Sequence, residues 1–299
     1  MFTEMRTFVL FGEEGSIRRV SERLPLTQPA VSRQIQRLEQ ALGVTLLDRR
    51  QKPPVLTPVG HQVLATSREM LALFESLKSL SKTTEPHGVF RLGLAHGLAS
   101  DQLGDAIVSA VANFPKVSLR LKSGWTTELA VQHQAGMLDA TILVSDGTRF
   151  QNAEHLGKES FAVIRGQGPW NKTRLEQAGW VLSSEQCEAR AQLAHVAARR
   201  GAALRVVAEV DDVSMQRALV QRGVGLGLMP RRLLKTGTPK GLKTVKIDSE
   251  LCLDVLLLRS PHLASMSKVA DTISAVVRQF LSGGASKHGR TTSEQTVSD

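Results

Sequence analysis

The stretch from Thr27 to Gly43, TQPAVSRQIQRLEQALG, decides how the front of this chain folds. Both ends of a helix are marked, because Thr27 is a suitable N-cap and Gly43 a suitable stop. Pro29 in the first turn costs no helical hydrogen bond. Helical spacing predicts a buried face made of Ala30, Val31, Ile35, Leu38 and Leu42. The opposite face carries side chains that hydrogen-bond base edges and phosphates, namely Gln28, Ser32, Arg33, Gln36 and Arg37. This is the composition of a DNA recognition helix.

A solvated surface helix is the alternative interpretation, because Gln, Ser and Arg are also common on exposed helix faces. The upstream residues favour DNA reading. Residues 1–12 predict a first amphipathic helix, and Ile17, Val20 and Leu24 predict a second that ends before Pro25. The second helix is separated from Thr27 by very few residues, as a helix-turn-helix requires.

Residues 44–58 predict a two-stranded wing. The segments 44–48 and 55–58 are short and β-prone, and a basic loop stiffened by proline joins them. The cations of this loop can neutralise phosphates or enter a minor groove, and they are Arg49, Arg50 and Lys52. Residues 1–58 therefore predict a winged helix-turn-helix domain.

The composition of the chain admits a two-domain soluble protein with an anionic partner. It has 299 residues, 41% of them hydrophobic, and a net charge of +10. We expect a cytoplasmic protein without membrane contact, because no apolar run reaches roughly 18 residues and no secretion signal opens the chain. Cys187 and Cys252 lie in no CxxC motif or His cluster, so we expect no disulfide framework, metal or other cofactor.

Residues 59–82 predict a linker helix. Its heptad positions are apolar or small, namely Val63, Thr66, Met70, Leu73, Leu77 and Leu80. This stripe favours dimerisation, and the alternative is a helix buried within a monomer. A dimer would place two recognition helices on the half-sites of an interrupted palindrome. Residues 83–88 then predict a hinge.

Strands and helices alternate over residues 89–282, which predicts a mostly parallel sheet with helices on both faces. The expected strands are 90–95, 117–122, 139–144, 161–165, 204–210 and 253–258. The expected helices are 102–114, 128–135, 187–200, 214–222 and 263–281. Residues 223–230, GVGLGLMP, predict a tight turn into a buried strand, because no Lys-Ser/Thr follows as in a phosphate-binding loop. The polar tail 283–299 is expected to be disordered.

Ligands of open α/β folds bind beyond the carboxyl ends of the strands. This rule selects a set of candidate effector-binding residues, namely His96, Gly97, Trp125, Thr126, Thr127, Ser145 and Asp212. Hydroxyls and backbone N–H groups suit a carboxylate, and Trp125 can stack on a ring. The alternative is that these residues are polar only because turns require it. No HxxxH, HExxH or GxSxG pattern surrounds His96, so we expect no catalytic residue.

The front of the chain resembles the LysR-type transcriptional regulators. The matching stretch, residues 8–60, follows their pattern of E-x-G-S, [ST]-Q-P-A-V-S-x-x-I-x-x-L-E-x-x-L-G and L-T-x-x-G in order and spacing. Two departures are Val20-Ser21 in place of Ala-Ala and Leu47 in place of Phe. By resemblance, the positions that approach bases are Gln28, Pro29, Ser32 and Arg33, and Arg49 to Lys52 form the wing.

The rest of the chain resembles the effector domain of that family more loosely. The resemblance implies a periplasmic-binding-protein-like (type II) fold of two α/β lobes joined by two crossovers, with Gly97 and Thr126 at effector-contacting positions. Lobe I would comprise about 89–160 and 262–282, and lobe II about 161–261.

We therefore expect a sequence-specific transcription regulator that is a homodimer or homotetramer. Its partners would be promoter DNA, RNA polymerase and a small anionic effector bound between the lobes. The alternatives are a small-molecule-binding protein or enzyme that uses the α/β domain, and a non-specific architectural DNA binder.

Overall fold

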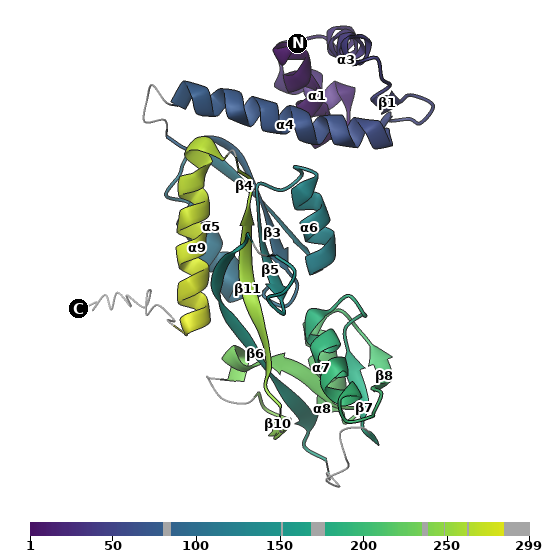
Figure 1. Cartoon of the computed structure of the whole chain (residues 1–299), viewed down its shortest axis with the longest axis vertical. Helices are drawn as coiled ribbons and strands as arrows, with labels where there is room; N and C mark the ends of the chain where they lie inside the picture. The colour runs from purple at the N-terminus through teal and green to yellow at the C-terminus, as the bar shows by residue number, and fades with distance from the viewer. Residues whose placement is uncertain are drawn as a thin grey trace, which may run out of the picture.

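The computed structural model describes residues 1–79, 85–150, 152–168, 177–234, 239–247, 249–261 and 263–283. Three short helices and a wing lie at one end of the molecule, against one side of a long helix, α4 (Figure 1). Two α/β lobes follow in line on the other side of α4. The predicted fold class is confirmed. The predicted tail after Gly283 lies outside the described residues.

The N-terminal domain consists of α1 (Phe2–Glu14), α2 (Ile17–Arg23), α3 (Gln28–Leu42) and a wing of β1 (Leu47–Asp48) paired with β2 (Val55–Leu56). One core joins these elements, formed by Met5, Phe8, Phe11, Val20, Val31, Ile35, Leu38, Leu46, Leu47 and Leu64. Val20 and Leu47, the departures from the family pattern, are both part of this core. The hydroxyl of Thr27 accepts a hydrogen bond from the Ala30 amide (3.4 Å), and Gly43 is left-handed at φ 68°, as predicted for the two ends of α3.

The inward orientation predicted for Leu42 is wrong. Its side chain is 43% exposed, whereas Leu38, one turn earlier, is 1% exposed. Leu38 is the last residue of α3 that packs in the core, so the last turn of the helix extends beyond the core.

The linker helix α4 (Pro58–Ser79) begins directly after the wing. The Thr57 hydroxyl donates to the Thr45 carbonyl (2.8 Å) and accepts from the Gly60 amide (2.9 Å), so it caps α4 and ties it to the wing. Leu64 enters the core of the N-terminal domain. Residues 80–84, which include Leu80 and the start of the predicted hinge, lie outside the described residues.

The central sheet has the order β10-β6-β11-β5-β3-β4, with β9 also paired to β6. Its strands are β3 (Gly88–Ala95), β4 (Val117–Gly124), β5 (Ala140–Ser145), β6 (Glu154–Gly166), β9 (Gly227–Pro230), β10 (Leu242–Val245) and β11 (Leu251–Arg259). Only the β3–β4 and β3–β5 pairs are parallel, so the expected mostly parallel sheet is wrong. The long strands β6 and β11 cross between the lobes in opposite directions, which makes the shared part of the sheet antiparallel.

Helices cover both faces of the sheet, as predicted. In lobe I, α5 (Asp101–Val111) and α9 (Ser267–Ser282) pack together on one face, and α6 (Thr126–Gln134) covers the other (Figure 1). Lobe II adds α7 (Glu188–Ala198), α8 (Val213–Gln221) and a parallel pair, β7 (Gly179–Leu182) with β8 (Arg205–Glu209). Two 3₁₀ turns, η2 (Arg231–Leu234) and η3 (Ala264–Met266), precede β10 and α9. The expectation missed β7 and β10, and it began α9 early because η3 continues the helical pattern.

The glycine-rich stretch 223–230 is a turn into a strand, as predicted. A Cβ on Gly225 would lie 2.6 Å from the Gly179 carbonyl oxygen, so the backbones of β7 and this segment touch. Gly223 has φ +79°, which favours glycine. The amides of Gly223, Val224 and Leu226 donate to backbone carbonyls, so they are not available to cradle a phosphate.

Two glycine substitutions should have opposite effects on stability. A Cβ on Gly60 would lie 2.2 Å from the Leu46 carbonyl oxygen, so Gly60→Ala should lower the free energy of unfolding by about 2 kcal/mol. Gly104 lies inside α5 with nothing within 4 Å, so Gly104→Ala should raise it by about 1 kcal/mol. Calorimetric unfolding of both variants checks this. Shifts of the same sign would contradict this packing of Gly60 and Gly104.

Candidate DNA-binding surface and effector site

The recognition face of α3 is exposed. Gln28, Pro29, Arg33, Gln36 and Arg37 are exposed and Ser32 is half-buried, whereas Val31, Ile35 and Leu38 are at most 1% exposed. The predicted division of α3 into a packing face and a polar face is therefore present. Packing holds the backbone of α3 and leaves these side chains accessible to a partner.

The wing is fastened to α3 by Glu39. Its carboxylate accepts hydrogen bonds from the amides of Leu46 (2.8 Å) and Leu47 (3.2 Å). The same carboxylate also accepts hydrogen bonds from both terminal nitrogens of Arg49, at 3.2 and 2.8 Å. Arg49 thus anchors the base of the wing, a role that the sequence did not reveal, in addition to its predicted place on the DNA-binding surface.

The other predicted wing cations lie further out. Arg50 is 91% exposed and hydrogen-bonds the Asp48 carboxylate at 2.9 and 2.8 Å. This hydrogen bonding lowers the pKa of Asp48 to about 2. Lys52 is exposed in the loop that follows. The face of α3 and the cations of the wing thus belong to one rigid unit held by Glu39.

The predicted effector residues of lobe I meet at one edge of the sheet. The His96 amide donates to the Gly124 carbonyl (3.0 Å), and the rings of His96 and Trp125 meet edge-on at 4.8 Å. Gly97 and Thr127 are exposed, and His96 and Trp125 are half-buried. The loops after β3 and β4 therefore present these four residues together.

Thr126 and Ser145 lie beneath that surface. Their exposed fractions are 3% and 0%, and the Thr126 hydroxyl donates to the Val144 carbonyl (2.9 Å). This bond fixes the start of α6 to the end of β5. The side chains of Thr126 and Ser145 therefore support the loops from inside.

Asp212 lies in lobe II as the N-cap of α8. Its carboxylate accepts hydrogen bonds from the Met215 amide (2.7 Å) and the Ser214 hydroxyl (2.5 Å). These hydrogen bonds, that of the Ser214 hydroxyl above all, lower its pKa. The structure thus gives Asp212 a capping role on the other lobe, apart from the four residues that meet in lobe I.

Arg232, which the sequence interpretation missed, bridges the two lobes. It follows the carboxyl end of β9 in lobe II, and its Nη2 donates to the Gly97 carbonyl of lobe I (3.0 Å). Its Nε lies 2.5 Å from Glu159, and its guanidinium lies 5.0 Å from the centre of the Phe280 ring. The rule of strand carboxyl ends would have found Arg232, had it been applied to β9 as well.

A second, more exposed pair also joins the lobes. Arg149, in the loop after β5, lies 3.5 Å from Glu188 at the start of α7. Burial raises the pKa of Glu188, and Arg149 opposes that rise. Arginines therefore bridge the lobes at two places. We call the region where the loops after β3, β4 and β5 of lobe I meet lobe II the lobe junction.

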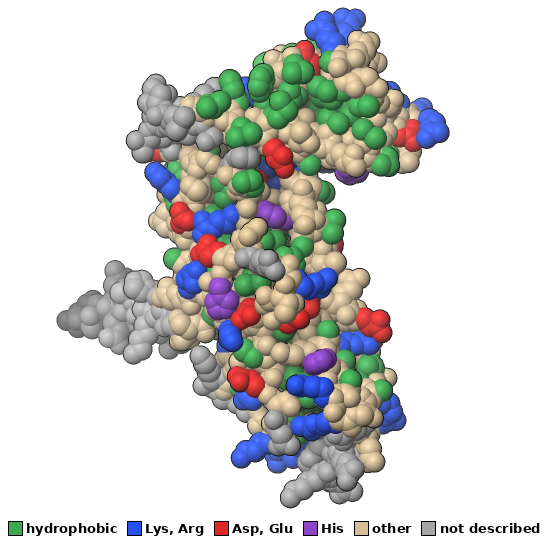
Figure 2. All heavy atoms as spheres, in the orientation of Figure 1, with side chains coloured by type: hydrophobic (Ala, Val, Ile, Leu, Met, Phe, Trp, Pro, Cys, Tyr) green, Lys and Arg blue, Asp and Glu red, His purple; other side chains and the backbone are tan. Residues whose placement is uncertain are grey.

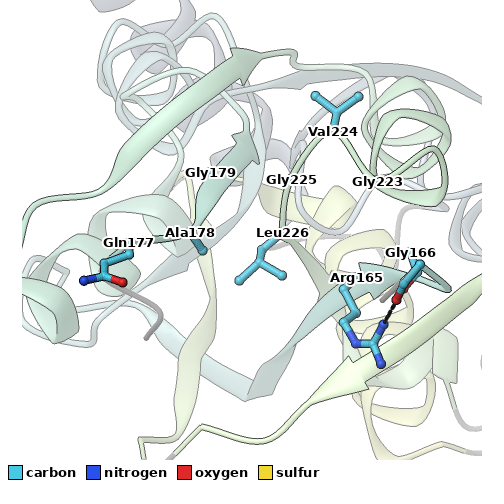
Figure 3. Close-up of a pocket in the computed structure, with 10 residues that line it drawn as sticks. Arg165, Gly166, Gln177, Ala178, Gly179, Gly223, Val224, Gly225 and Leu226 are labelled. Atoms are coloured by element: carbon cyan, nitrogen blue, oxygen red, sulfur yellow. Dashed lines mark hydrogen bonds between the residues drawn. The ribbon is translucent and has the colours of Figure 1, made fainter. Parts of the chain in front are cut away.

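A pocket of about 420 Å³ lies elsewhere in lobe II, beside the glycine-rich turn (Figure 3). Arg165 lines it and donates to the carbonyls of Gly166 (2.8 Å) and Gly168 (3.0 Å). The pocket lies at the amino end of β7, and none of the residues that line it is a predicted effector residue.

Other site types find no support in the described part of the chain. No three His, Cys, Asp or Glu side chains gather there as they would around a metal ion, and Cys187 and Cys252 are free thiols. Among the same residues, no helix is both long and apolar enough to cross a bilayer.

Family models match both parts of the chain. Residues 2–61 match the bacterial regulatory helix-turn-helix protein, lysR family, and residues 83–281 match the LysR substrate binding domain. The HTH-type transcriptional regulator TfdS of Cupriavidus pinatubonensis is 30% identical over 247 residues, which cover 77% of this chain and 82% of TfdS.

Solved structures share the fold over more than nine tenths of the chain. Full-length OxyR from Pseudomonas aeruginosa has a TM-score of 0.76 at 19% identity, covering 93% of this chain and 97% of its own. ArgP from Mycobacterium tuberculosis has a TM-score of 0.67 at 18% identity, covering 92% and 96%. The two domain matches and the likeness to TfdS rule out the enzyme alternative: the chain belongs to the LysR family of DNA-binding transcriptional regulators with an effector-binding domain.

Proposed function

We propose that this regulator binds a specific promoter sequence as a homodimer or homotetramer and is controlled by a small anionic effector at the lobe junction. The observation that carries the DNA part is the exposed face of α3, joined rigidly to the wing through Glu39. Gln28, Ser32 and Arg33 supply hydrogen bonds for base edges, and Arg50 and Lys52 supply charge for phosphates.

The exposed side of α4 supports the dimer. Met70, Leu73 and Leu77 are 38%, 44% and 66% exposed, and they repeat at helical spacing. Phe2 adds to the same apolar surface, with its ring 4.9 Å from that of Phe74. Apolar side chains gather over the helices at this end of the molecule (Figure 2). A second copy of α4 would bury this stripe.

A second apolar surface supports assembly beyond a dimer. The groove between α5 and the edge strand β4 has a volume of about 470 Å³. It is lined by Val108, Val111, Ala112, Phe114, Pro115, Val117, Leu119 and Leu121. Since α4 and this groove are separate surfaces, both could be covered in a homotetramer.

The lobe junction supports an anionic ligand through two features. The N-cap residue of α6, Trp125, makes no side-chain cap hydrogen bond, so the backbone N–H groups of the first turn are left for an anion to bind. Arg232 supplies a cation, and its Nη1 is buried without a hydrogen-bond partner among the described residues. Trp125 and His96 offer ring surfaces for the rest of the ligand.

Specific DNA binding is tested by selecting duplexes from a random pool with the full-length protein. Arg33→Ala should weaken binding to the selected duplex by about 1–3 kcal/mol, because a base or phosphate contact is lost. The control Arg217→Ala removes the same charge from the exposed side of α8 and should leave the affinity for the selected duplex unchanged. Equal affinity for selected and scrambled duplexes at physiological salt would instead support the architectural alternative.

Dimerisation through α4 is tested by sedimentation. Leu73→Glu places a charge in the apolar stripe and should yield monomers, whereas Val131→Glu on α6, at 59% exposure, should not. The monomer should bind half of the selected palindrome as well as the wild-type protein does. An unchanged sedimentation coefficient for Leu73→Glu would exclude α4 as the interface.

The effector class is tested by thermal-shift screening of small carboxylates and small amines. We expect a carboxylate to raise the melting temperature of the wild type, and Trp125→Ala to abolish that shift while Trp125→Phe retains part of it. Hits confined to amines would refute the anionic assignment.

A further inference from the structure

A cluster of four charged side chains joins the N-terminal domain to lobe I of the same protomer. We call Glu13, Arg68, Arg91 and Asp139 the interdomain cluster. Arg91, on β3, forms an ion pair with Glu13 at the end of α1. Its Nη1 lies 3.4 Å from the Asp139 carboxylate, and its backbone amide donates to the same oxygen at 2.7 Å. One arginine thus binds a carboxylate from each domain.

Arg68 adds a contact from the linker helix. Its Nη1 donates to the Gly136 carbonyl at 2.9 Å, in the turn that precedes Asp139. The same turn lies on the backbone of α4, because a Cβ on Gly136 would be 3.4 Å from the Ala65 Cα. Gly136 is left-handed at φ +63°, which favours glycine at this contact. The turn 135–139 is therefore held by α4 and, through Arg91, by α1.

The interdomain cluster is screened from water. The side chains of Glu13, Arg91 and Asp139 are 9%, 15% and 25% exposed, and Arg68 is half-buried. Within the cluster two carboxylates face two guanidinium groups, and Glu13 also lies 3.4 Å from Nη1 of the more exposed Arg23. Removing one member would leave a largely screened charge with one fewer opposite charge beside it, which is costlier than losing an exposed pair such as Arg18 with Glu22.

Two elements connect this cluster to the lobe junction. The helix α6 starts at Thr126, which is bonded to β5, and ends at Gln134, directly before the turn 135–139. The strand β3 carries Arg91 and ends at Ala95, directly before His96. Both elements are rigid and short, so a displacement at the lobe junction would move the lobe I side of the interdomain cluster.

We propose that Glu13, Arg68, Arg91 and Asp139 are positioning residues that set where the recognition helix lies relative to lobe I, and that α6 and β3 transmit effector binding to them. The transmission rests on the proposed effector site. The docking itself does not, because it follows from contacts within the protomer.

The docking is tested by hydrogen exchange on the full-length protein without ligand. Glu13→Gln and Arg91→Met should each speed amide exchange about tenfold in residues 135–139 and at the end of α1. Amides of β7 and β8 in lobe II should not change, nor should any of these amides in the control Glu22→Gln. Because the two variants share the Glu13–Arg91 contact, the double variant should speed exchange by less than the two single effects combined. Unchanged exchange at 135–139, additive effects or faster exchange throughout the chain would overturn the proposal.

The positioning role is tested on the duplex selected with the wild-type protein. The Glu13→Gln variant should bind an isolated half-site normally but the full palindrome about fivefold more weakly. On the palindrome both N-terminal domains of the dimer must be held in place, and loosely docked domains lose more conformational freedom when they bind. Arg33→Ala should lose affinity for both. Equal loss on both duplexes, or no loss on either, would overturn the positioning role. If no specific duplex is selected at all, the proposed function fails, whereas the exchange experiment still decides the docking.

Discussion

The antiparallel pairing of β11 with both β5 and β6 is the interaction on which the rest of the α/β domain depends. This single strand lies beside the end of lobe I and continues into lobe II, so the two lobes share one sheet and one main core. The strand ends of both lobes are thereby brought to the lobe junction. Without that pairing, Arg232 of lobe II would have no fixed distance to Gly97 of lobe I.

The apolar cores hold each unit of this molecule together, whereas charged side chains fix how the separately packed units are oriented against each other. Glu39 holds the wing on α3, Arg91 holds lobe I on α1, and Arg232 holds lobe II on lobe I. Each of these side chains is largely screened from water or accepts several hydrogen bonds. Directional bonds of this kind define an orientation, which non-directional apolar burial does not.

The recognition helix was predictable because its signals are local. Thr27, Gly43 and the apolar spacing between them act over one or two turns, and the structure places both ends of α3 there. Predictions failed where distant parts of the chain decide. Leu42, in the last turn of α3, is exposed, and the Thr126 side chain is buried where β5 supplies an acceptor at Val144. The mixed direction of the sheet follows from β6 and β11, whose pairing joins residues about a hundred positions apart.

The sequence alone determined the winged helix-turn-helix, the linker helix, the alternation of strands and helices, and the family, because periodicity, caps and motif spacing are properties of neighbouring residues. The sequence also indicated which loops form the lobe I side of the lobe junction, because the carboxyl ends of parallel strands meet at one edge of a sheet. Only the tertiary structure decided which of those side chains face outward, that Arg232 joins them, and that Glu13 meets Arg91. The Glu13–Arg91 ion pair joins residues that are 78 positions apart in the sequence, and the Arg232–Gly97 hydrogen bond joins residues that are 135 positions apart. Such contacts leave no local signal, because an arginine in the sequence does not show its partner until the fold supplies it.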